Sequence, residues 1–491
     1  MDCGLEVAEP RHRYGSWRRL FRDTMQLSRQ QLPAVIRRFL PGGEPSCLPI
    51  GLDLGQGVVR MVQCKLTDTS SEPGPAREGN RELPLETASV RIESAERREL
   101  HQNYSQARGD HVTAARQWES SGPIVAELLK RGRFEGRRVC AVLPRPMQMI
   151  KTLRLQSSRP QEMPRLIAEE ASTGFGIDLA SGDFIVHFLP GDVLRRGSDQ
   201  FTEGLLLIAR RSDVDRYVAT LHEWGAEVVS VDFSAVSLYR GLGRFGRRQR
   251  DEDEVHVVVD VGRSQSQVLI GRGRRLSFNK SIGIGGETFS AAVAKKLGVS
   301  LSDADLLRRR LARQLRAKLD AFQSTPSPRE VLEALIDDPV HRSVQAVTRS
   351  VVEDLARELS LCLRYYSVTF RGQPPSSLNL CGGIAEDPAF RAWLDLALPV
   401  EVKAHAPITE LMPALETPAE SAIKHFDRPT EWATALGAAL QQAPSGLSSQ
   451  HGRSRRVQEE ADLREMAGAG PSDSNESPSE SSQHEGEAAH A

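Results

Sequence analysis

Two segments of the chain share one pattern of apolar residues, aspartate and glycine. The first, Ile50–Gly57, reads Ile-Gly-Leu-Asp-Leu-Gly-Gln-Gly, and the second, Val257–Ser264, reads Val-Val-Val-Asp-Val-Gly-Arg-Ser. Another apolar run follows each turn, at Val58–Val62 and Gln267–Ile270, so each segment predicts a β-hairpin. A third strand with a glycine turn is expected at Leu378–Gly383. Two such hairpins followed by a Gly-Gly turn predict two lobes that close on one ligand.

The residue types at these turns suit the binding of phosphate. Glycine lets backbone N–H groups approach an anion because it has no Cβ, and successive N–H groups at such a turn form a concave nest for oxygen atoms. Asp53 and Asp260 would repel phosphate directly, but a carboxylate can hold the hydrated Mg²⁺ that contacts phosphates. For either hairpin alone, an ordinary β-turn with Asp and Gly as turn formers is the better interpretation. The ordered set favours a nucleotide held between two lobes.

The composition excludes several other classes of protein. The chain has 491 residues, 39% of them hydrophobic, and a formal net charge of −1, which indicates a globular protein and gives no support to nucleic-acid binding. The six cysteines are scattered without a CxxC pair, which argues against a zinc site and favours a reducing cytoplasm. The sequence contains no P-loop, HExxH or GxSxG motif. No apolar run is long enough to span a bilayer and no signal peptide is recognisable, so any membrane contact should be peripheral.

The two ends of the chain differ from its middle. Residues 1–48 combine many arginines with apolar residues at helical spacing, including Trp17 and Phe21, and predict a basic amphipathic extension. A solvated helix or an arm packed on the body is the alternative for this segment. Residues 443–491 are acidic, rich in serine and poor in apolar residues, so we expect a disordered tail.

Between these ends, strands alternate with helices and predict an α/β protein with a mixed α+β subdomain. We expect a first lobe over residues 49–243, with an inserted subdomain at 139–231, and a second lobe over residues 244–442. Apolar residues recur at steps of three and four from Val340 to Phe370, which predicts a long amphipathic helix. Another helix is expected to begin at Ser302.

Taken in order, these motifs resemble the actin, Hsp70 and sugar-kinase class of ATP clamps. Within that class they resemble the PilM family of type IV pilus assembly proteins, which is competence protein A-like. No single segment is specific, but the ordered series is. The similarity runs from Pro49 to Leu440 through Ile50–Gly55, Val58–Val62, Val139–Pro144, Glu162–Glu170, Ile177–Leu179, Phe184–Phe188, Leu206–Arg210, Trp224–Asp232, Val258–Gly262, Ser281–Glu287, Asp303–Arg308, Leu378–Gly383 and Thr434–Leu440.

The resemblance implies an actin-like, ribonuclease H-like bilobed fold with ATP and Mg²⁺ between the lobes. Asp53 would hold the hydration shell of the metal, and Asp260 would orient metal or water as the candidate catalytic residue. Asp305 and Arg308 occupy the positions of the family's Glu and Lys near the ribose and base. The glycines before a helix could place a helix N-terminus at an anion. The implied nucleotide site comprises Asp53, Gly55, Gln56, Gly57, Val58, Asp260, Gly262, Arg263, Ser264, Gln265, Gly285, Gly286, Asp305, Arg308, Gly382, Gly383 and Ile384.

Both turns depart from the family pattern. Gln56 and Gly57 stand where the family usually has hydroxyl residues, and Arg263 stands where it usually has alanine. Arg263 could pair with a phosphate in bidentate geometry or block the site by lying in it. We therefore expect ATP binding with slow hydrolysis at most.

The resemblance also implies a function. The protein would be a cytoplasmic ATP-binding adaptor of a type IV pilus or related secretion platform, at the inner face of the cytoplasmic membrane. It would bind the cytoplasmic N-terminal segment of a PilN-like bitopic membrane protein beside the inserted subdomain. Other platform proteins, self-association and a membrane contact through residues 1–48 are further partners to consider, whereas nucleic acid is not expected. The first alternative is a nucleotide-free structural adaptor of the same fold, as in type II secretion, and the last is a small-molecule kinase.

Overall fold

The computed structural model describes residues 47–68, 88–100, 117–131, 133–156, 162–178, 181–196, 199–243, 254–322, 325–335, 339–370, 375, 377–411 and 428–442. The chain divides into two compact units, and every described residue belongs to the first, which comprises residues 1–76 and 88–443. The predicted tail lies outside the described residues, as does all of the predicted N-terminal extension except residues 47 and 48.

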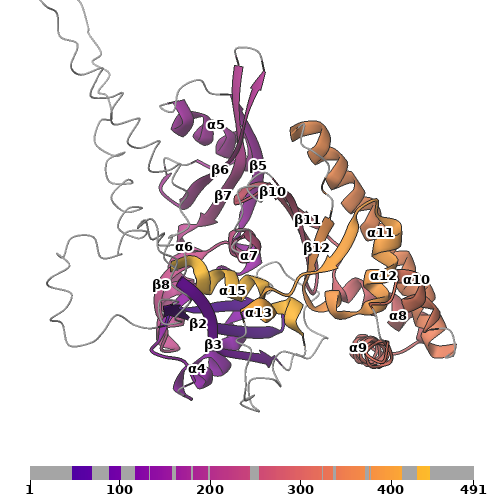
Figure 1. Ribbon diagram of the computed structural model, residues 1–491. Coiled ribbons are helices and arrows are strands. Elements are labelled where there is room, and N and C mark those ends of the chain that lie inside the picture. The colour runs from indigo at the N-terminus through magenta and orange to yellow at the C-terminus, as the bar shows by residue number, and fades with distance from the viewer. Residues whose placement is uncertain are drawn as a thin grey trace, which may run out of the picture. The chain divides into compact units, whose positions relative to one another are not determined.

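The first lobe is built on a five-stranded sheet with the order β3-β2-β1-β4-β8 (Figure 1). Its strands are β1 (Ile50–Gly55), β2 (Val58–Asp68), β3 (Ala88–Glu99), β4 (Arg138–Val142) and β8 (Glu227–Asp232). β1 and β2 form the first predicted hairpin, in which Gly55 pairs with Val58 across a two-residue turn. Gly57 has a φ of +88°, a conformation that favours glycine. Ile50 and Leu52 are fully buried, which explains why alternate residues of β1 are apolar.

The second lobe is built on a sheet with the order β11-β10-β9-β12-β13. Its strands are β9 (Val255–Val261), β10 (Ser266–Arg272), β11 (Arg275–Ile282), β12 (Ser377–Cys381) and β13 (Glu401–Ala404). β9 and β10 form the second predicted hairpin, and β12 pairs parallel to β9, so the Gly382–Gly383 turn lies beside the turn after Asp260. In each sheet the strand that carries the aspartate is the central one.

Helices flank both sheets, and the long predicted one is present as α11. The α-helices are α4 (Gly122–Lys130), α5 (Met163–Phe175), α6 (Arg211–Glu223), α7 (Ser234–Gly243), α8 (Gly286–Leu297), α9 (Leu301–Leu319), α10 (Pro328–Glu333), α11 (Pro339–Phe370), α12 (Pro388–Ala397), α13 (Pro407–Glu410) and α15 (Ala433–Ala439). The 3₁₀ helices are η2 (Gln117–Ser121), η3 (Arg145–Met147), η7 (Gly383–Glu386), η8 (Pro429–Trp432) and η9 (Leu440–Gln442).

The start of α9 differs from the prediction. The helix begins earlier than Ser302, because Ser300 is the N-cap residue and its side chain accepts a hydrogen bond from the backbone N–H of Asp303 at 3.1 Å. Ser300 has the extended backbone that an N-cap requires, whereas Ser302 lies in the first helical turn.

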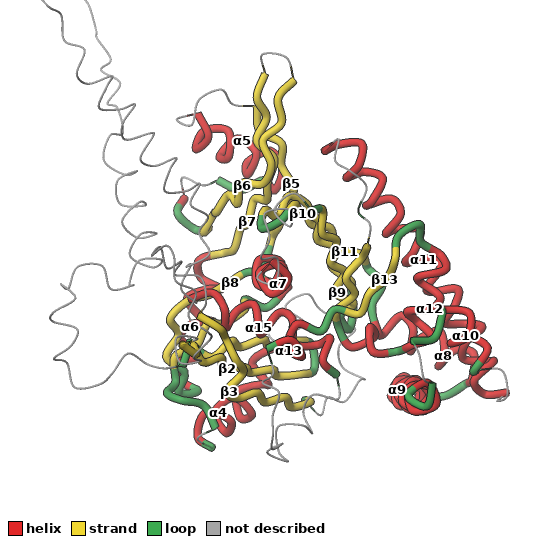
Figure 2. Tube along the Cα trace, viewed as in Figure 1, coloured by secondary structure: helices red, strands yellow, loops and turns green. Residues whose placement is uncertain are grey.

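A separate three-stranded sheet is inserted into the first lobe. It comprises β5 (Met149–Gln156), β6 (Phe184–Arg196) and β7 (Asp199–Arg210) in the order β5-β7-β6, and α5 packs on it through an apolar cluster (Figure 2). We predicted an insert over residues 139–231, but β4 and β8 at its two ends pair within the first sheet. The separate sheet is therefore narrower than predicted. It contacts the second lobe at Thr152, whose hydroxyl accepts a hydrogen bond from the backbone N–H of Asn279 at 3.2 Å.

The C-terminal helix α15 packs on the first lobe, although it follows the second lobe in the sequence. Two glycines allow this contact. A Cβ on Gly51 would lie 2.0 Å from the carbonyl oxygen of Ala435, and a Cβ on Gly437 would lie 1.7 Å from the carbonyl oxygen of Ser237 on α7. Residues 433–439 are all buried. The two lobes are therefore connected twice, once between α7 and β9 and again before α15.

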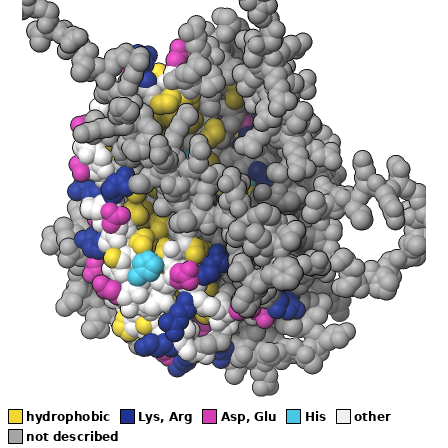
Figure 3. Space-filling model, turned by 90° about the vertical axis from the view of Figure 1, so that its left-hand side faces the viewer, with side chains coloured by type: hydrophobic (Ala, Val, Ile, Leu, Met, Phe, Trp, Pro, Cys, Tyr) yellow, Lys and Arg dark blue, Asp and Glu magenta, His cyan; other side chains and the backbone are white. Residues whose placement is uncertain are grey.

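Charges of both signs lie on the described part of one face of the molecule (Figure 3). Figure 3 shows one face of the molecule, on which the described Lys and Arg side chains are mixed with Asp and Glu side chains. Among the described helices, none is both long enough and apolar enough to span a bilayer.

Candidate functional site

A cavity of about 550 Å³ lies between the two lobes. The turns of both hairpins, part of α9 and the segment before α15 line it. The structure brings all of the predicted site residues to this cavity except Gly285. Gly285 lies behind the second turn, where a Cβ would be 2.5 Å from the backbone nitrogen of Gln265. A larger residue would not fit at position 285, so the role of this glycine is structural.

The two aspartates are both paired with arginines. Asp53 lies directly opposite Arg60 in the β1–β2 register, and Arg60 Nη1 donates to Asp53 Oδ2 at 3.0 Å. Asp260 accepts a hydrogen bond from Arg145, which follows β4 in the first lobe, so this ion pair joins the two lobes. Burial raises the pKa of Asp53 more than Arg60 lowers it, and the nearby charge of Asp260 raises it further.

Arg263 lies across the cleft, against the opposite hairpin. Its Nη1 atom is 2.6 Å from the position that a Cβ of Gly57 would occupy. Its Nε donates to Glu287 Oε1 at 2.7 Å. The structure thus places the guanidinium between the two turns that were predicted to hold phosphates.

The first amides of α8, which we predicted could meet an anion, are hydrogen-bonded within the protein. The backbone N–H groups of Gly286 and Glu287 donate to the carbonyl oxygens of Gly262 and Arg263, at 2.9 and 2.8 Å. These amides hold the second turn against the helix, and they are not open to an anion in this arrangement.

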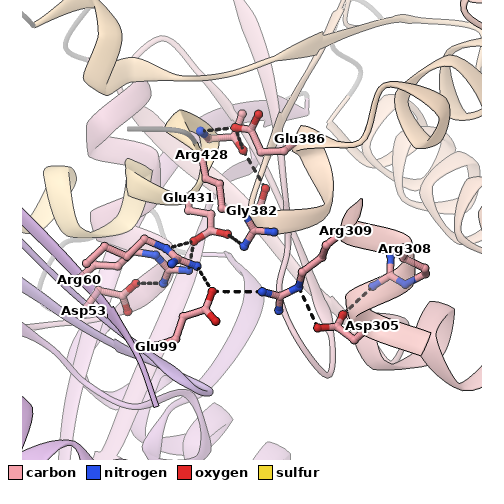
Figure 4. Close-up of polar contacts among 12 residues, drawn as sticks. Asp53, Arg60, Glu99, Asp305, Arg308, Arg309, Gly382, Glu386, Arg428 and Glu431 are labelled. Carbon is pink, nitrogen blue, oxygen red and sulfur yellow. Dashed lines mark hydrogen bonds and ion pairs between the residues drawn. The ribbon is translucent and has the colours of Figure 1, made fainter. Parts of the chain in front are cut away.

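Further ion pairs cross the cavity. A series of contacts runs from β1 to α9 through Asp53, Arg60, Glu431, Arg97, Glu99, Arg309, Asp305 and Arg308. Figure 4 labels all of these residues except Arg97. Glu99 Oε1 accepts from Arg97 at 2.8 Å and from Arg309 at 3.1 Å, so it links β3 of the first lobe to α9 of the second. Arg308 also donates to the hydroxyl of Ser290 at 3.2 Å, which ties α9 to α8.

Glu431 is the centre of this series. Its side chain is 2% exposed and accepts hydrogen bonds from Arg60 at 3.1 Å, Arg97 at 2.9 Å and Arg428 at 2.6 Å. Burial alone would raise the pKa of Glu431, but the three arginines outweigh burial and lower the pKa to about 2. The carboxylate also separates Arg60 from Arg97, which are cross-strand neighbours with like charges.

Close packing within the protein explains why glycines occupy positions 382 and 383. A Cβ on Gly382 would lie 2.4 Å from the carbonyl oxygen of Val261, and one on Gly383 would lie 2.7 Å from Glu431 Oε1. The hydroxyl of Thr430 donates to the carbonyl oxygen of Gly382 at 2.8 Å. Thr430 therefore binds the second lobe, and Glu431 binds the first lobe.

Several residues of the site were not predicted from the sequence, among them Arg60, Arg97, Arg145 and Glu431. A signal existed for Arg60, because a two-residue turn at Gln56–Gly57 places it opposite Asp53. Arg145 directly follows the predicted strand and Pro144. No local pattern points to Glu431, which is 371 residues from Arg60 in the chain.

These contacts test whether a magnesium ion fits the residues present. Asp53 and Asp260 already hold guanidinium groups, and within the described part of the chain no group of three or more His, Cys, Asp and Glu side chains could hold a metal ion. Mg²⁺ usually takes one or two carboxylates together with water and phosphate oxygens. Both aspartates would have to release their arginines before they could hold the ion. The arrangement therefore does not fit the predicted Mg²⁺.

Two five-stranded sheets, each with a glycine-turn hairpin at a shared cavity and with a small inserted sheet, define an actin-like fold. A solved structure of a PilM-PilN type IV pilus biogenesis complex contains a chain with this fold. The two chains are 18% identical, the match covers 81% of this chain and 99% of that chain, and the TM-score is 0.56. The match confirms, at the level of the fold, the predicted resemblance to a chain of this complex.

Two further solved structures are less similar to this chain. The ethanolamine utilization protein EutJ from Carboxydothermus hydrogenoformans is 15% identical over 82% of this chain and 93% of that chain, with a TM-score of 0.40. MreB 5 of Spiroplasma citri bound to AMPPNP is 12% identical over 82% of this chain and 98% of that chain, with a TM-score of 0.39. Comparison of the sequence with protein-family models and with curated proteins finds no match.

Proposed function

We propose that this protein is a cytoplasmic adaptor of a type IV pilus or related secretion platform. In this role it binds the cytoplasmic N-terminal segment of a PilN-like inner-membrane protein beside the inserted sheet, and a nucleotide, ATP, between its lobes. The observation that carries the proposal is the agreement of its fold with a chain of the PilM-PilN complex over 99% of that chain.

The cavity supports the nucleotide part of the proposal. Its volume of about 550 Å³ lies within the usual range for small-molecule sites. The turns at 55–58 and 262–265 would hold the phosphates, Asp305 and Arg308 would lie near the ribose, and Gly382–Ile384 near the base. We expect hydrolysis to be slow at most, because Arg145 engages the candidate catalytic residue Asp260.

A nucleotide-free adaptor of the same fold is the second candidate. The specific observation that favours it is the set of ion pairs that join the lobes without any ligand. Arg145–Asp260 and Glu99–Arg309 both cross the cavity. In this case the lobes would keep one arrangement whether or not a nucleotide is present.

Peptide binding tests the adaptor function and separates the two candidates. We would titrate full-length protein with a synthetic peptide of the N-terminal cytoplasmic segment of the PilN-like protein from the same organism. Saturating ATP should change the dissociation constant of the peptide by about fivefold or more, the lower end of typical coupling between two sites, and the peptide should change the affinity for ATP by the same factor. A scrambled peptide is the control. Absence of peptide binding would contradict the adaptor function, and peptide binding without any ATP binding would establish the second candidate.

A further inference from the structure

The positive charges at the two hairpins are arginine side chains of the protein. Among the described residues, the nine cationic side chains that line the cavity are all arginines, and eight Asp and Glu side chains line it with them. Arginine offers five N–H donors in a planar fork, so one guanidinium can bind a carboxylate with one edge and an oxyanion with another. A point charge such as lysine lacks this geometry.

Arg145 has the position that a bridging cation would need. Its Nη2 atom donates to Asp260. Its Nη1 atom lies at the second turn, 3.3 Å from the position that a Cβ of Gly262 would occupy. The guanidinium of Arg145 therefore lies between the carboxylate of Asp260 and the glycine turn at Gly262. A metal ion held by Asp260 would stand in the same order between carboxylate and phosphate.

Arg263 supplies a second cation from the opposite direction. It extends from the second turn to Gly57 of the first, as described above. Its partner Glu287 has a side chain that is 40% exposed, so this ion pair costs little to exchange for a phosphate contact. Arg145 and Arg263 thus each place a guanidinium from one lobe at the turn of the other lobe.

We propose that Arg145 and Arg263 replace the magnesium ion, so that the cleft binds the polyphosphate of a nucleotide without a metal. This inference rests on the proposed nucleotide function and names the residues that determine its metal requirement. Bidentate hydrogen bonds from the two guanidinium groups neutralise the phosphate oxygens, while the arginine partners of Asp53 and Asp260 keep these carboxylates from repelling the ligand.

Calorimetric titration of full-length protein tests the proposal, with ATP in Mg²⁺ buffer and ATP in EDTA as the two conditions. We expect dissociation constants that agree within about threefold. Binding that weakens tenfold or more in EDTA would overturn the inference and leave the proposed nucleotide function standing. Absence of binding in both buffers would overturn both. Tripolyphosphate should compete with ATP in EDTA, and failure to compete would contradict phosphate recognition by the arginines.

Two variants identify the residues. Arg145→Met and Arg263→Met each remove a guanidinium and keep an unbranched apolar stem, so each should weaken ATP binding in EDTA by about tenfold or more. Arg349→Met is the matched control, because Arg349 lies on α11 outside the cavity lining and its side chain is 54% exposed. Arg145→Met also leaves Asp260 without this partner, so unfolding by urea is measured for every variant. If folded Arg263→Met binds ATP as tightly as wild type, the proposal is wrong.

Discussion

Replacement of Glu431 by alanine is expected to lower the free energy of unfolding by about 3 to 5 kcal/mol, the usual cost of removing one partner from a buried ion pair. Three arginines share this carboxylate, and Arg60 and Arg97 would then face each other across β2 and β3 with like charges. The change also removes the contact by which the segment before α15 is held to the first sheet. Urea unfolding at neutral pH gives the loss directly.

Glu353→Ala is the matched control for this prediction. Glu353 pairs with Arg349 one turn away on α11, and its side chain is 50% exposed, so the loss should stay below about 1 kcal/mol. Equal losses in the two variants would show that the arginine cluster does not depend on Glu431.

The low pKa of Glu431 adds a pH dependence to the same prediction. Its pKa of about 2 in the folded state lies below the ordinary value of 4.5, so its stabilising contribution is present above about pH 4.5 and is lost as the pH falls towards 2. The difference corresponds to about 3 kcal/mol. Glu431→Gln should lack this part of the acid unfolding curve.

Gly437→Ala is expected to destabilise the protein by about 3 kcal/mol, at the upper end of the cost of overpacking. A Cβ there would lie 1.7 Å from the carbonyl oxygen of Ser237, and this backbone atom cannot rotate away as a side chain could. Helix α15 must therefore shift away from α7. Because α15 begins two residues after Glu431, the same shift should loosen the arginine cluster. Thermal and urea unfolding both report the effect.

Gly283→Ala is the control for the glycine prediction. A Cβ at Gly283 would meet no atom within 4 Å, so the change should stay within about 0.5 kcal/mol. If Gly437→Ala is as stable as Gly283→Ala, the close packing of α15 on α7 is wrong.

The parts of the fold that depend on local patterns could be predicted from the sequence. Both hairpins were predicted because an apolar strand, an aspartate and a glycine turn are close together in the chain. The long helix α11 was predicted because its apolar residues repeat every three or four positions. The separate sheet is narrower than the predicted insert, because β4 and β8 are continuous in sequence with its strands. Their pairing with the first sheet is a long-range contact that no local pattern shows.

The candidate site could be predicted only as far as its turns. The sequence placed Asp53 and Asp260 at one cavity, but it could not show that arginines from elsewhere in the chain reach both carboxylates. Arg263 departs from the family pattern, and the sequence left open whether it pairs with a phosphate or blocks the site. Only the structure shows that its guanidinium lies against Gly57. Contacts such as Arg60 with Glu431 depend on how α15 returns to the first lobe, which no local pattern encodes.

Hydrogen–deuterium exchange of the full-length protein, with and without millimolar ATP, tests most directly whether the two hairpins hold one nucleotide between the lobes. We expect slower amide exchange at residues 55–58, 262–265 and 382–384 over the same range of ATP concentration. Unchanged exchange at both turns, or protection at only one of them, would contradict this expectation.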